Sequence, residues 1–364
     1  MKIGIVGLGL IGGSIALGAK KLEYEVSGFD ISDNAIQTAI SNQIINSLES
    51  IESMSNTCDI IVLCTPPKET IKYLETALSG TAIVTDVSSV KKQVCEFVET
   101  LDENLRNNFI GGHPMAGSEQ SGIDAARENL FYQKMWVLVP PRNSSLKNVS
   151  IIETFISALG AEHCVLSTEQ HDQLVAGISH LPHLASAVLM DLAKKSSVEN
   201  EIILRLAGGG FRDMTRIAAS NTKMWLDIVD MNAEEIAEQL SVYISELEKL
   251  KSNIETHNAD AIEKLFIRTR KARQSLPDAA RRLEHLCELL VPVPDTPGVL
   301  AKIAGLTQDI NIYDIKILHS LEEDRGVLSL VVSPEHSEIL INKLTDNGFQ
   351  VVLSQLDIGQ ADED

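Results

Sequence analysis

Residues 2–14 read KIGIVGLGLIGGS, a short apolar run followed at once by glycines with the spacing G-x-G-x-x-G. The run predicts a buried strand, and the glycines stand where such a strand turns into a helix. Gly7 would make the tight turn, Gly9 would let the backbone approach a pyrophosphate, and Gly12 would let the helix pack closely on the strand. Taken alone, the motif also fits a glycine-rich turn that binds no ligand.

The next apolar run supports the cofactor interpretation. Residues 26–29 predict a second strand, which ends in Asp30 at roughly the 20-residue offset where an acid hydrogen-bonds the adenosine ribose of a dinucleotide. A carboxylate there would repel a 2′-phosphate, so the pattern favours NAD over NADP. Leu10 and Ile11, inside the glycine motif, would lie at the helix N-terminus that faces the phosphates.

The composition of the 364-residue chain excludes several classes of protein. Lys and Arg number 31 against 51 Asp and Glu, and this net charge of −20 disfavours nucleic acids and anionic membranes as partners. The five cysteines are scattered without C-x-x-C spacing, so neither a disulfide framework nor a metal site is expected. No apolar run reaches transmembrane length and the first strand begins at once, so we expect a cytoplasmic protein.

Strands alternate with helices through residues 1–166, a pattern that predicts a doubly wound, Rossmann-type α/β domain. Strands are expected near residues 3–6, 25–29, 60–64, 82–85, 109–111, 135–139 and 163–166. Loops at the carboxyl ends of parallel strands converge on the ligand, so Thr65, Pro66 and Asp86 are predicted to contact the nicotinamide end of the cofactor. The Thr65-Pro66-Pro67 segment also fits simple turn chemistry.

Residues 111–122, GGHPMAGSEQSG, gather a histidine, small residues and a carboxylate on one irregular segment. Proline pushes its predecessor toward extended geometry, so His113 is expected at a strand end or turn. A histidine there suits a proton acceptor, because an imidazole titrates near neutral pH. A structural histidine that caps a turn is the alternative.

From residue 167 the pattern changes to long helices. A capping box at residues 167–170 would begin the first of them, with Thr168 near its N-cap. His180 and His183 follow at i and i+3, too few ligands for a metal but able to reach a substrate from one helix face. Pro182, between them, would bend the helix.

A glycine triplet then leads into Arg212 and Arg216, spaced i and i+4 in the segment GGGFRDMTR of residues 208–216. Arginine clamps carboxylates with its planar fork, so the pair is a candidate anion site, although ion pairing with Asp213 or Asp227 would also explain it. Helices are expected from 224 to about 251 and from 258 to 286. Such helices often bury apolar stripes against another subunit, which indicates a homodimer.

The last part of the chain, residues 287–364, follows the order strand, helix, strand, strand, helix, strand. That order predicts a ferredoxin-like α+β domain. Pro297 and Gly298 would start a helix whose backbone amides could hold the carboxylate of an amino acid.

Together these motifs resemble the prephenate dehydrogenase family of tyrosine biosynthesis, and the tail resembles an ACT domain, a small-molecule sensing module. The resemblance implies a nucleotide-binding domain (1–166), a helical substrate-binding and dimerisation domain (167–286) and an ACT regulatory domain (287–364). It also implies that His113 is the catalytic histidine, that Ser89 hydrogen-bonds to it, and that Arg216 grips a substrate carboxylate. The positions that the family uses around the substrate correspond to Ser118, Glu119, His183, Gly209, Arg212 and Trp225. Arg212 departs from members that carry lysine there.

The implied reaction is the NAD-dependent oxidative decarboxylation of prephenate. Arogenate, which carries an ammonium in place of the keto group, is an alternative substrate, and Ser118 and Glu119 are expected to decide between the two. Another hydroxy-acid dehydrogenase, or an amino-acid-sensing NAD-binding regulator without turnover, are further alternatives. If the tail is an ACT domain, tyrosine would bind near Asp295, Gly298 and Asn311.

Overall fold

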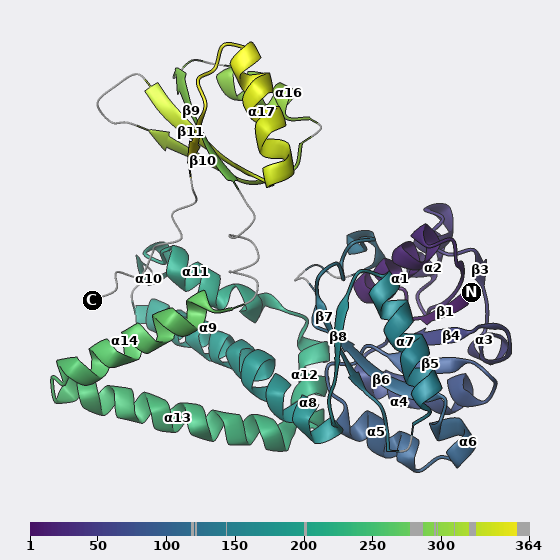
Figure 1. The fold of residues 1–364 in the computed structure, drawn as a ribbon. Helices are drawn as coiled ribbons and strands as arrows, with labels where there is room; N and C mark the ends of the chain where they lie inside the picture. Colours follow the sequence, from purple (N-terminus) through teal and green to yellow (C-terminus); the bar gives the residue numbers. More distant parts are fainter. Residues whose placement is uncertain are drawn as a thin grey trace. The chain divides into compact units, whose positions relative to one another are not determined.

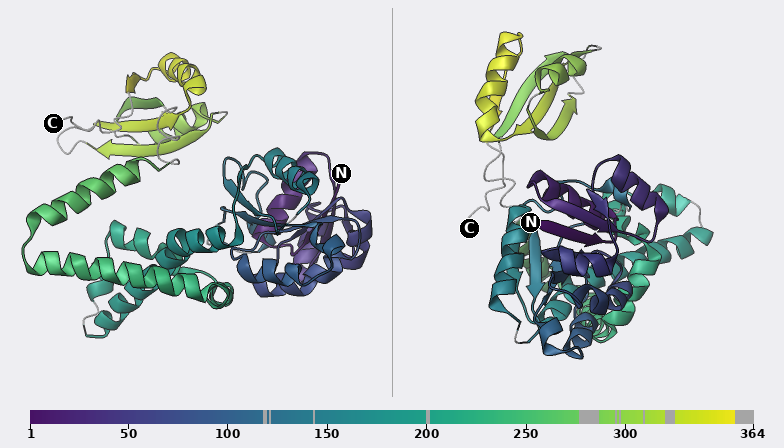
Figure 2. Two further views of the ribbon diagram at one scale, coloured as in Figure 1. Left: turned by 60° about the horizontal axis from the view of Figure 1, so that its bottom comes forward. Right: turned by 90° about the vertical axis from the view of Figure 1, so that its right-hand side faces the viewer.

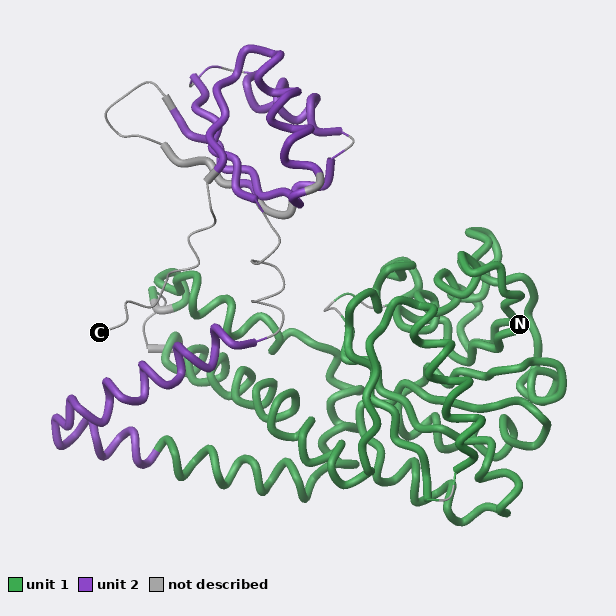
Figure 3. Tube along the Cα trace, viewed as in Figure 1, with its two compact units in different colours: residues 1–247 green, residues 248–364 purple. Residues whose placement is uncertain are grey.

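The structure of the chain is a computed structural model (Figure 1). It describes residues 1–117, 120, 122–142, 144–199, 202–276, 287–294, 296, 298–308, 310–319 and 325–354. The chain divides into two compact units, Met1–Leu247 and Glu248–Asp364 (Figure 3). This division falls inside a helix and does not coincide with the domain boundaries expected at residues 166 and 286, which therefore stay predictions.

Unit 1 contains an eight-stranded sheet with the order β3-β2-β1-β4-β5-β6-β7-β8. The strands are β1 (Lys2–Val6), β2 (Glu25–Phe29), β3 (Ser47–Leu48), β4 (Ile60–Leu63), β5 (Ile83–Asp86), β6 (Phe109–Pro114), β7 (Met135–Val139) and β8 (Glu162–Val165). Strands β1 to β6 all pair in parallel. Their spatial order, 3-2-1-4-5-6, is that of dinucleotide-binding sheets, and β7 runs antiparallel to β6. The Rossmann-type expectation is confirmed.

Two differences concern the strands. The two-residue strand β3 carries too short a pattern to be predicted. Strand β6 extends to Pro114, beyond the expected 109–111, and His113 is its penultimate residue, opposite Val137 of β7, so the expected strand-end position is confirmed. Pairing with β7 satisfies this extended backbone, to which the proline already restricts its predecessor.

Helices cover both faces of this sheet (Figure 1, Figure 2). They are α1 (Leu10–Lys21), α2 (Asp33–Ser41), α3 (Ile51–Thr57), α4 (Pro67–Leu78), α5 (Lys92–Glu99), α6 (Glu103–Arg106), the 3₁₀ turn η1 (Ile123–Ala125) and α7 (Leu146–Ala158). Alternate strand residues face opposite sides: Ile60 and Val62 join the core under α1 and α7, whereas Ile61 and Leu63 join the core under α3, α4 and α5. The strands between the edge strands β3 and β8 are buried on both faces, which explains their continuous apolar runs.

The rest of unit 1 is helical. It comprises α8 (Thr168–Val175), a π-helical turn η2 (Ala176–His180), α9 (Leu181–Glu199), α10 (Ile202–Arg205), α11 (Gly209–Thr215), the 3₁₀ turn η3 (Arg216–Ala219), α12 (Thr222–Met231) and the part of α13 (Ala233–Glu255) up to Leu247. The capping box is present, but its N-cap is Ser167 and Thr168 is the first helical residue. The single helix expected from 224 to about 251 is broken at Asn232, whose buried side chain bonds elsewhere.

Residues Thr168–Ser197 form one continuous helical run that, by length and composition alone, could cross a membrane. No run of this kind was expected from the sequence. At one end of the run, the buried Asp172 carboxylate accepts the backbone N–H groups of Lys91 and Lys92 at the start of α5. The π-helical turn of the run directly precedes Leu181 and Pro182. Because proline lacks an N–H and clashes with the preceding turn, the widened turn accommodates it.

Unit 2 contains α14 (Ala259–Gln274), which ends well before residue 286, and a four-stranded antiparallel sheet. Its elements are β9 (Cys287–Pro294), α16 (Val299–Leu306), β10 (Ile312–His319), β11 (Arg325–Val332), α17 (Pro334–Asp346) and β12 (Val352–Ser354). The spatial order β10-β11-β9-β12 is that of a ferredoxin-like fold, with apolar residues of the sheet and both helices in one core.

Candidate active site

The glycine loop between β1 and α1 has the geometry expected of a pyrophosphate site. Gly7 has a φ of +98°, and a Cβ on Gly12 would lie 1.9 Å from the Gly7 carbonyl oxygen. Gly9 is the N-cap of α1, yet a Cβ there would meet no protein atom within 4 Å. Gly7 and Gly12 are therefore required by the fold, whereas Gly9 borders open space at the helix N-terminus, where a dinucleotide fits.

Asp30 lies beside this loop. Its carboxylate accepts hydrogen bonds from the Leu8 N–H at 2.6 Å and the Ser32 N–H at 2.7 Å. Leu10 and Ile11 form the first turn of α1, at the same helix N-terminus. The residues present therefore fit the adenosine and pyrophosphate parts of a dinucleotide.

A substitution at Gly9 separates cofactor binding from folding. We expect Gly9→Val to raise the KM for NAD by about tenfold or more, because the side chain fills the space for the pyrophosphate, with each tenfold worth about 1.4 kcal/mol. The added Cβ meets no protein atom within 4 Å, so the melting temperature should fall by only a few degrees, the cost of valine at an N-cap. Gly12→Val is the contrasting variant and should lower the melting temperature much further, because its Cβ would clash with the Gly7 carbonyl. An unchanged KM for NAD in Gly9→Val would contradict the assignment.

His113 lies at one end of a buried hydrogen-bonded chain. It is 9 % exposed, and its Nδ1 is 2.8 Å from Nε2 of His171 on α8. Nδ1 of His171 is in turn 2.6 Å from Oδ1 of Asp172. The Asp172 carboxylate also accepts the backbone N–H groups of Lys91 and Lys92, each at 2.8 Å, at the start of α5. A strand histidine is thus tied, through α8, to the N-terminus of a second helix.

Asp86 does not have the exposed position that was predicted for a cofactor contact. Its side chain is fully buried and forms an ion pair with the buried Lys91, Oδ2 to Nζ at 2.5 Å. It also accepts the N–H groups of Ser88 and Gly112, each at 3.0 Å. The carboxylate thereby connects the ends of β5 and β6, and its predicted contact with the cofactor stays a prediction.

A second group of side chains connects to this hydrogen-bonded chain at Asp172; its members are Asn232, His180, His183 and Trp225. Asn232 donates a hydrogen bond from Nδ2 to the Asp172 backbone oxygen at 3.0 Å, and the same Nδ2 is 3.2 Å from Nδ1 of His180. Trp225 stacks on His183, with ring centroids 3.5 Å apart and planes at 11°, and meets His180 edge to face at 5.9 Å. The helix break at Asn232 is what lets its amide reach α8.

Burial holds His113, His180 and His183 in the neutral form. Burial lowers the pKa of His113 well below its ordinary value of 6.5, and the neighbouring His171, Lys91 and His180 lower it further. Burial also lowers the pKa of His180 to about 4 and lowers that of His183. Burial alone would raise the pKa of Asp172, but hydrogen bonds from His171 and the Lys92 N–H outweigh it and the pKa falls. At neutral pH the site therefore offers uncharged imidazoles beside one carboxylate.

The other predicted residues lie in several places. Ser89 is half-buried on the loop after β5, and among the described residues His113 bonds to His171 and not to Ser89. Thr65 bonds to Thr70 at 2.9 Å, and Pro66 is the exposed N-cap of α4. Ser118 and Glu119 lie outside the described residues.

The glycine and arginine segment packs on α9, the helix that carries His183. Gly209 opens α11, and Arg212 and Arg216 are exposed on α11 and η3. Within the residues that the structure describes, no group of three His, Cys, Asp or Glu side chains could hold a metal ion.

Sequence reasoning missed His171, Asp172 and Asn232. A signal was present for Asp172, because Asp172, Ala176, His180 and His183 are spaced four, four and three residues apart. That spacing puts them on one helix face. Nothing local in the sequence marks Asn232.

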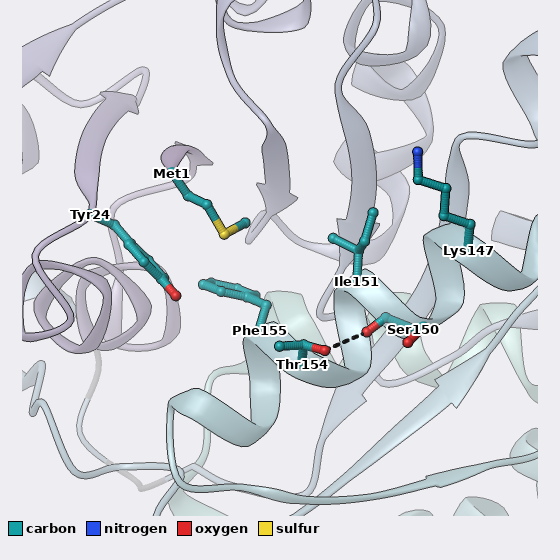
Figure 4. A pocket seen from close by; sticks show the side chains of 7 residues that line it. All are labelled: Met1, Tyr24, Lys147, Ser150, Ile151, Thr154 and Phe155. Atoms are coloured by element: carbon teal, nitrogen blue, oxygen red, sulfur yellow. Dashed lines mark hydrogen bonds between the residues drawn. The ribbon is translucent and has the colours of Figure 1, made fainter.

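The structure also contains a pocket of about 400 Å³ (Figure 4). Its lining residues are Met1, Tyr24, Lys147, Ser150, Ile151, Thr154 and Phe155. Met1 and Tyr24 precede β1 and β2, so the pocket lies at the amino ends of these strands, opposite the glycine loop. It contains none of the predicted site residues and is not the candidate active site.

Family models decide the family of this chain. The nucleotide-binding domain of prephenate dehydrogenase matches residues 15–165, and the dimerization domain of prephenate dehydrogenase matches residues 167–268. The chain belongs to the prephenate dehydrogenase family. The resemblance expected from the sequence motifs is thereby confirmed.

Individual relatives agree with this family. The chain is 33% identical to the prephenate dehydrogenase of Lactococcus lactis over 96% of its own length and 99% of that protein. It is 32% identical to the prephenate dehydrogenase of Bacillus subtilis over 90% of each chain. Among solved structures, it is similar to a prephenate dehydrogenase from A. aeolicus in complex with hydroxyphenyl propionate and NAD+, with a TM-score of 0.70 and 29% identity over 75% of this chain and 97% of that one.

Proposed function

We propose that this member of the prephenate dehydrogenase family oxidises prephenate with NAD and releases carbon dioxide and 4-hydroxyphenylpyruvate. The observation that carries the proposal is the neutral imidazole of His113, buried and hydrogen-bonded through Nδ1, on a sheet whose glycine loop fits a dinucleotide. The relatives that match most of the chain carry the same activity in their names. A regulator without turnover would not need such a proton acceptor.

The residues account for the chemistry of the substrate. Prephenate carries a ring hydroxyl and two carboxylates, and its oxidation removes a hydride from the hydroxyl-bearing carbon and a proton from the oxygen. NAD, when bound, accepts the hydride. His113, as a neutral imidazole, accepts the hydrogen bond and the proton of the hydroxyl. The ketone formed is a vinylogous β-keto acid, which loses carbon dioxide readily because the ring becomes aromatic.

Substrate binding is assigned to residues on the helical segments and on the loop after β6. We propose that Arg216 holds a carboxylate, because the protein carries a net charge of −20 and a dianion needs local fixed positive charge. Around it we place Ser118, Glu119, His183, Gly209, Arg212 and Trp225, and we place Ser89 beside His113. The stacked pair of His183 and Trp225 supports this assignment, since it offers a flat apolar surface to a ring.

NAD is proposed as the cofactor, bound by Gly7, Gly9, Leu10, Ile11, Gly12 and Asp30, with Thr65 and Pro66 nearer the nicotinamide. The Asp30 carboxylate disfavours a 2′-phosphate and supports NAD over NADP. Formation of NADH by the purified chain from prephenate and NAD tests the whole proposal. Arogenate dehydrogenase activity is the second candidate, and no NADH from either substrate would reject both.

A homodimer is proposed from the helical part of unit 1. Large apolar side chains there are strongly exposed, among them Ile178 at 68 %, Leu226 at 66 % and Val188 at 59 %. The family model that covers this region describes a dimerization domain. A second copy would bury these side chains.

We propose a soluble cytoplasmic enzyme with domains 1–166, 167–286 and 287–364.

The C-terminal domain is proposed to be an ACT domain that binds tyrosine. Its support is the ferredoxin-like strand order, and Gly298, which has a φ of +93° at the N-cap of α16. Asn311 is exposed just before β10, and Asp295 lies outside the described residues.

Tyrosine is expected to bind the full-length chain and to inhibit NADH formation. Calorimetry with tyrosine should give a saturable heat of binding, and a titration of the prephenate assay should show inhibition over the same concentration range. Phenylalanine, which lacks the phenolic hydroxyl, is the matched control ligand. Absence of any heat with tyrosine would overturn the regulatory assignment and leave the catalytic one intact.

A further inference from the structure

We propose that His171 and Asp172 form a proton relay with His113, which fixes the Nε2 lone pair of His113 toward the substrate hydroxyl. The inference rests on the proposed function for its substrate, and on the hydrogen-bonded chain for its geometry. In it His113 is the catalytic residue, while His171 and Asp172 are positioning residues that act through it.

The position of the proton on each imidazole ring follows from Asp172, the residue at the other end of the hydrogen-bonded chain from His113. The Asp172 carboxylate accepts the Lys91 and Lys92 N–H groups, so it is an acceptor toward His171 as well, and the proton between them lies on His171 Nδ1. In the proposed relay His171 carries one proton, on Nδ1, and its Nε2 is bare. The 2.8 Å contact from this atom to Nδ1 of His113 requires the proton on His113 Nδ1, which leaves His113 Nε2 as the acceptor.

Hydrogen bonds to its side chain and to its backbone oxygen fix the position of Asp172. Its two carboxylate oxygens each take one backbone N–H at the start of α5, and its own backbone oxygen accepts a hydrogen bond from Asn232. The N-terminus of α5 favours negative charge, which keeps the carboxylate ionised in a buried position. The relay thus begins at a fixed charge and ends at the substrate side of β6.

During turnover the relay accepts the proton of the substrate hydroxyl and later returns it. The hydroxyl O–H bond breaks as a bond to His113 Nε2 forms, and the Nδ1 proton of His113 passes to His171 Nε2. The positive charge then pairs with Asp172, so the net charge of the hydrogen-bonded group changes from −1 to zero. When loss of carbon dioxide turns the ring oxygen into a phenolate, the proton returns along the same path to that oxygen. The side chains end each turnover in their starting protonation states.

The other charged groups near His113 cannot replace Asp172. Lys91 and His180 would both oppose positive charge on His113. The second carboxylate close by, Asp86, is already neutralised by Lys91 in a fully buried ion pair. Asp172 is therefore the carboxylate that can stabilise a proton taken up by the histidine pair.

The test combines a spectroscopic and a kinetic measurement on the full-length protein. Nitrogen NMR of histidine-labelled protein at neutral pH, with the His113 signal assigned from its loss in His113→Asn, should show a protonated Nδ1 and a bare Nε2. Asp172→Asn should lose this single tautomer, lower kcat by roughly 10²-fold and change both KM values by less than about twofold. Glu234→Gln is the matched control, because it removes an exposed carboxylate that pairs with Lys92 at 2.9 Å outside the relay.

Either a protonated Nε2 on wild-type His113 or a near wild-type kcat in Asp172→Asn would overturn the relay. The wild-type spectrum decides the matter even if Asp172→Asn does not fold. If the wild-type protein forms no NADH from prephenate but shows the expected tautomer, the proposed function fails and the geometry of the relay stands.

Discussion

Replacement of His113 by asparagine lowers kcat for prephenate by roughly 10²- to 10⁴-fold, the usual contribution of a general base, and leaves the Kd for NAD unchanged. Asparagine retains a hydrogen-bonding group near the Nδ1 position but cannot take up a proton. The imidazole that it replaces is neutral at working pH because burial lowers its pKa. The glycine loop and Asp30, to which we assign the adenosine part of NAD, belong to β1, α1 and β2 and are not altered.

Steady-state kinetics and a calorimetric titration with NAD check this result on the same preparation. The control is His163→Asn, a partly exposed histidine on β8 of the same sheet, whose Nε2 lies 3.6 Å from Glu153. This control should retain wild-type kcat. A His113→Asn variant with kcat close to wild type would remove His113 from the mechanism.

Replacement of Arg216 by alanine lowers kcat/KM for prephenate by about 10²-fold. A charge-assisted hydrogen bond contributes about 1.5–3 kcal/mol, and a bidentate arginine contact to a carboxylate lies at the upper end of that range. The loss is large because the surrounding protein is strongly acidic and offers the dianionic substrate little other attraction. Arg216 is exposed at the start of η3, so the fold should tolerate the change.

Two further variants test whether the loss in Arg216→Ala is specific to the guanidinium at this position. Arg216→Lys keeps the charge but loses the planar fork, and should lie between wild type and alanine. Arg268→Ala removes an exposed arginine of α14 from the basic run 268–273 and should leave kcat/KM unaltered. If Arg216→Ala had unchanged kcat/KM, the carboxylate would have to be held elsewhere, with Arg212 the next residue to replace.

The sequence predicted those parts of the molecule that depend on local pattern. The glycine spacing required a turn with positive φ at Gly7 and close packing at Gly12, and both are present. Apolar runs located seven of the eight strands of the large sheet to within a few residues, because strands buried on both faces are continuously apolar. The same periodicity gave the element order of the C-terminal domain.

The parts that escaped prediction depend on contacts between distant segments. The bond between His113 and His171 joins residues 58 positions apart, and Asn232 reaches Asp172 across 60 positions. Asp86 was assigned to the cofactor because it ends a strand, but the ion pair with Lys91 keeps it inside the sheet. Its partner could not be identified without the structure, since an aspartate at a strand end has the same local pattern in either role.

The most direct test of the central claim is a steady-state comparison of NADH formation from prephenate and from arogenate, with NAD or NADP as oxidant and carbon dioxide release measured alongside. We expect the highest kcat/KM with prephenate and NAD, and one carbon dioxide released for each NADH formed. A higher kcat/KM with arogenate, or NADH formation without carbon dioxide release, would contradict the proposed reaction.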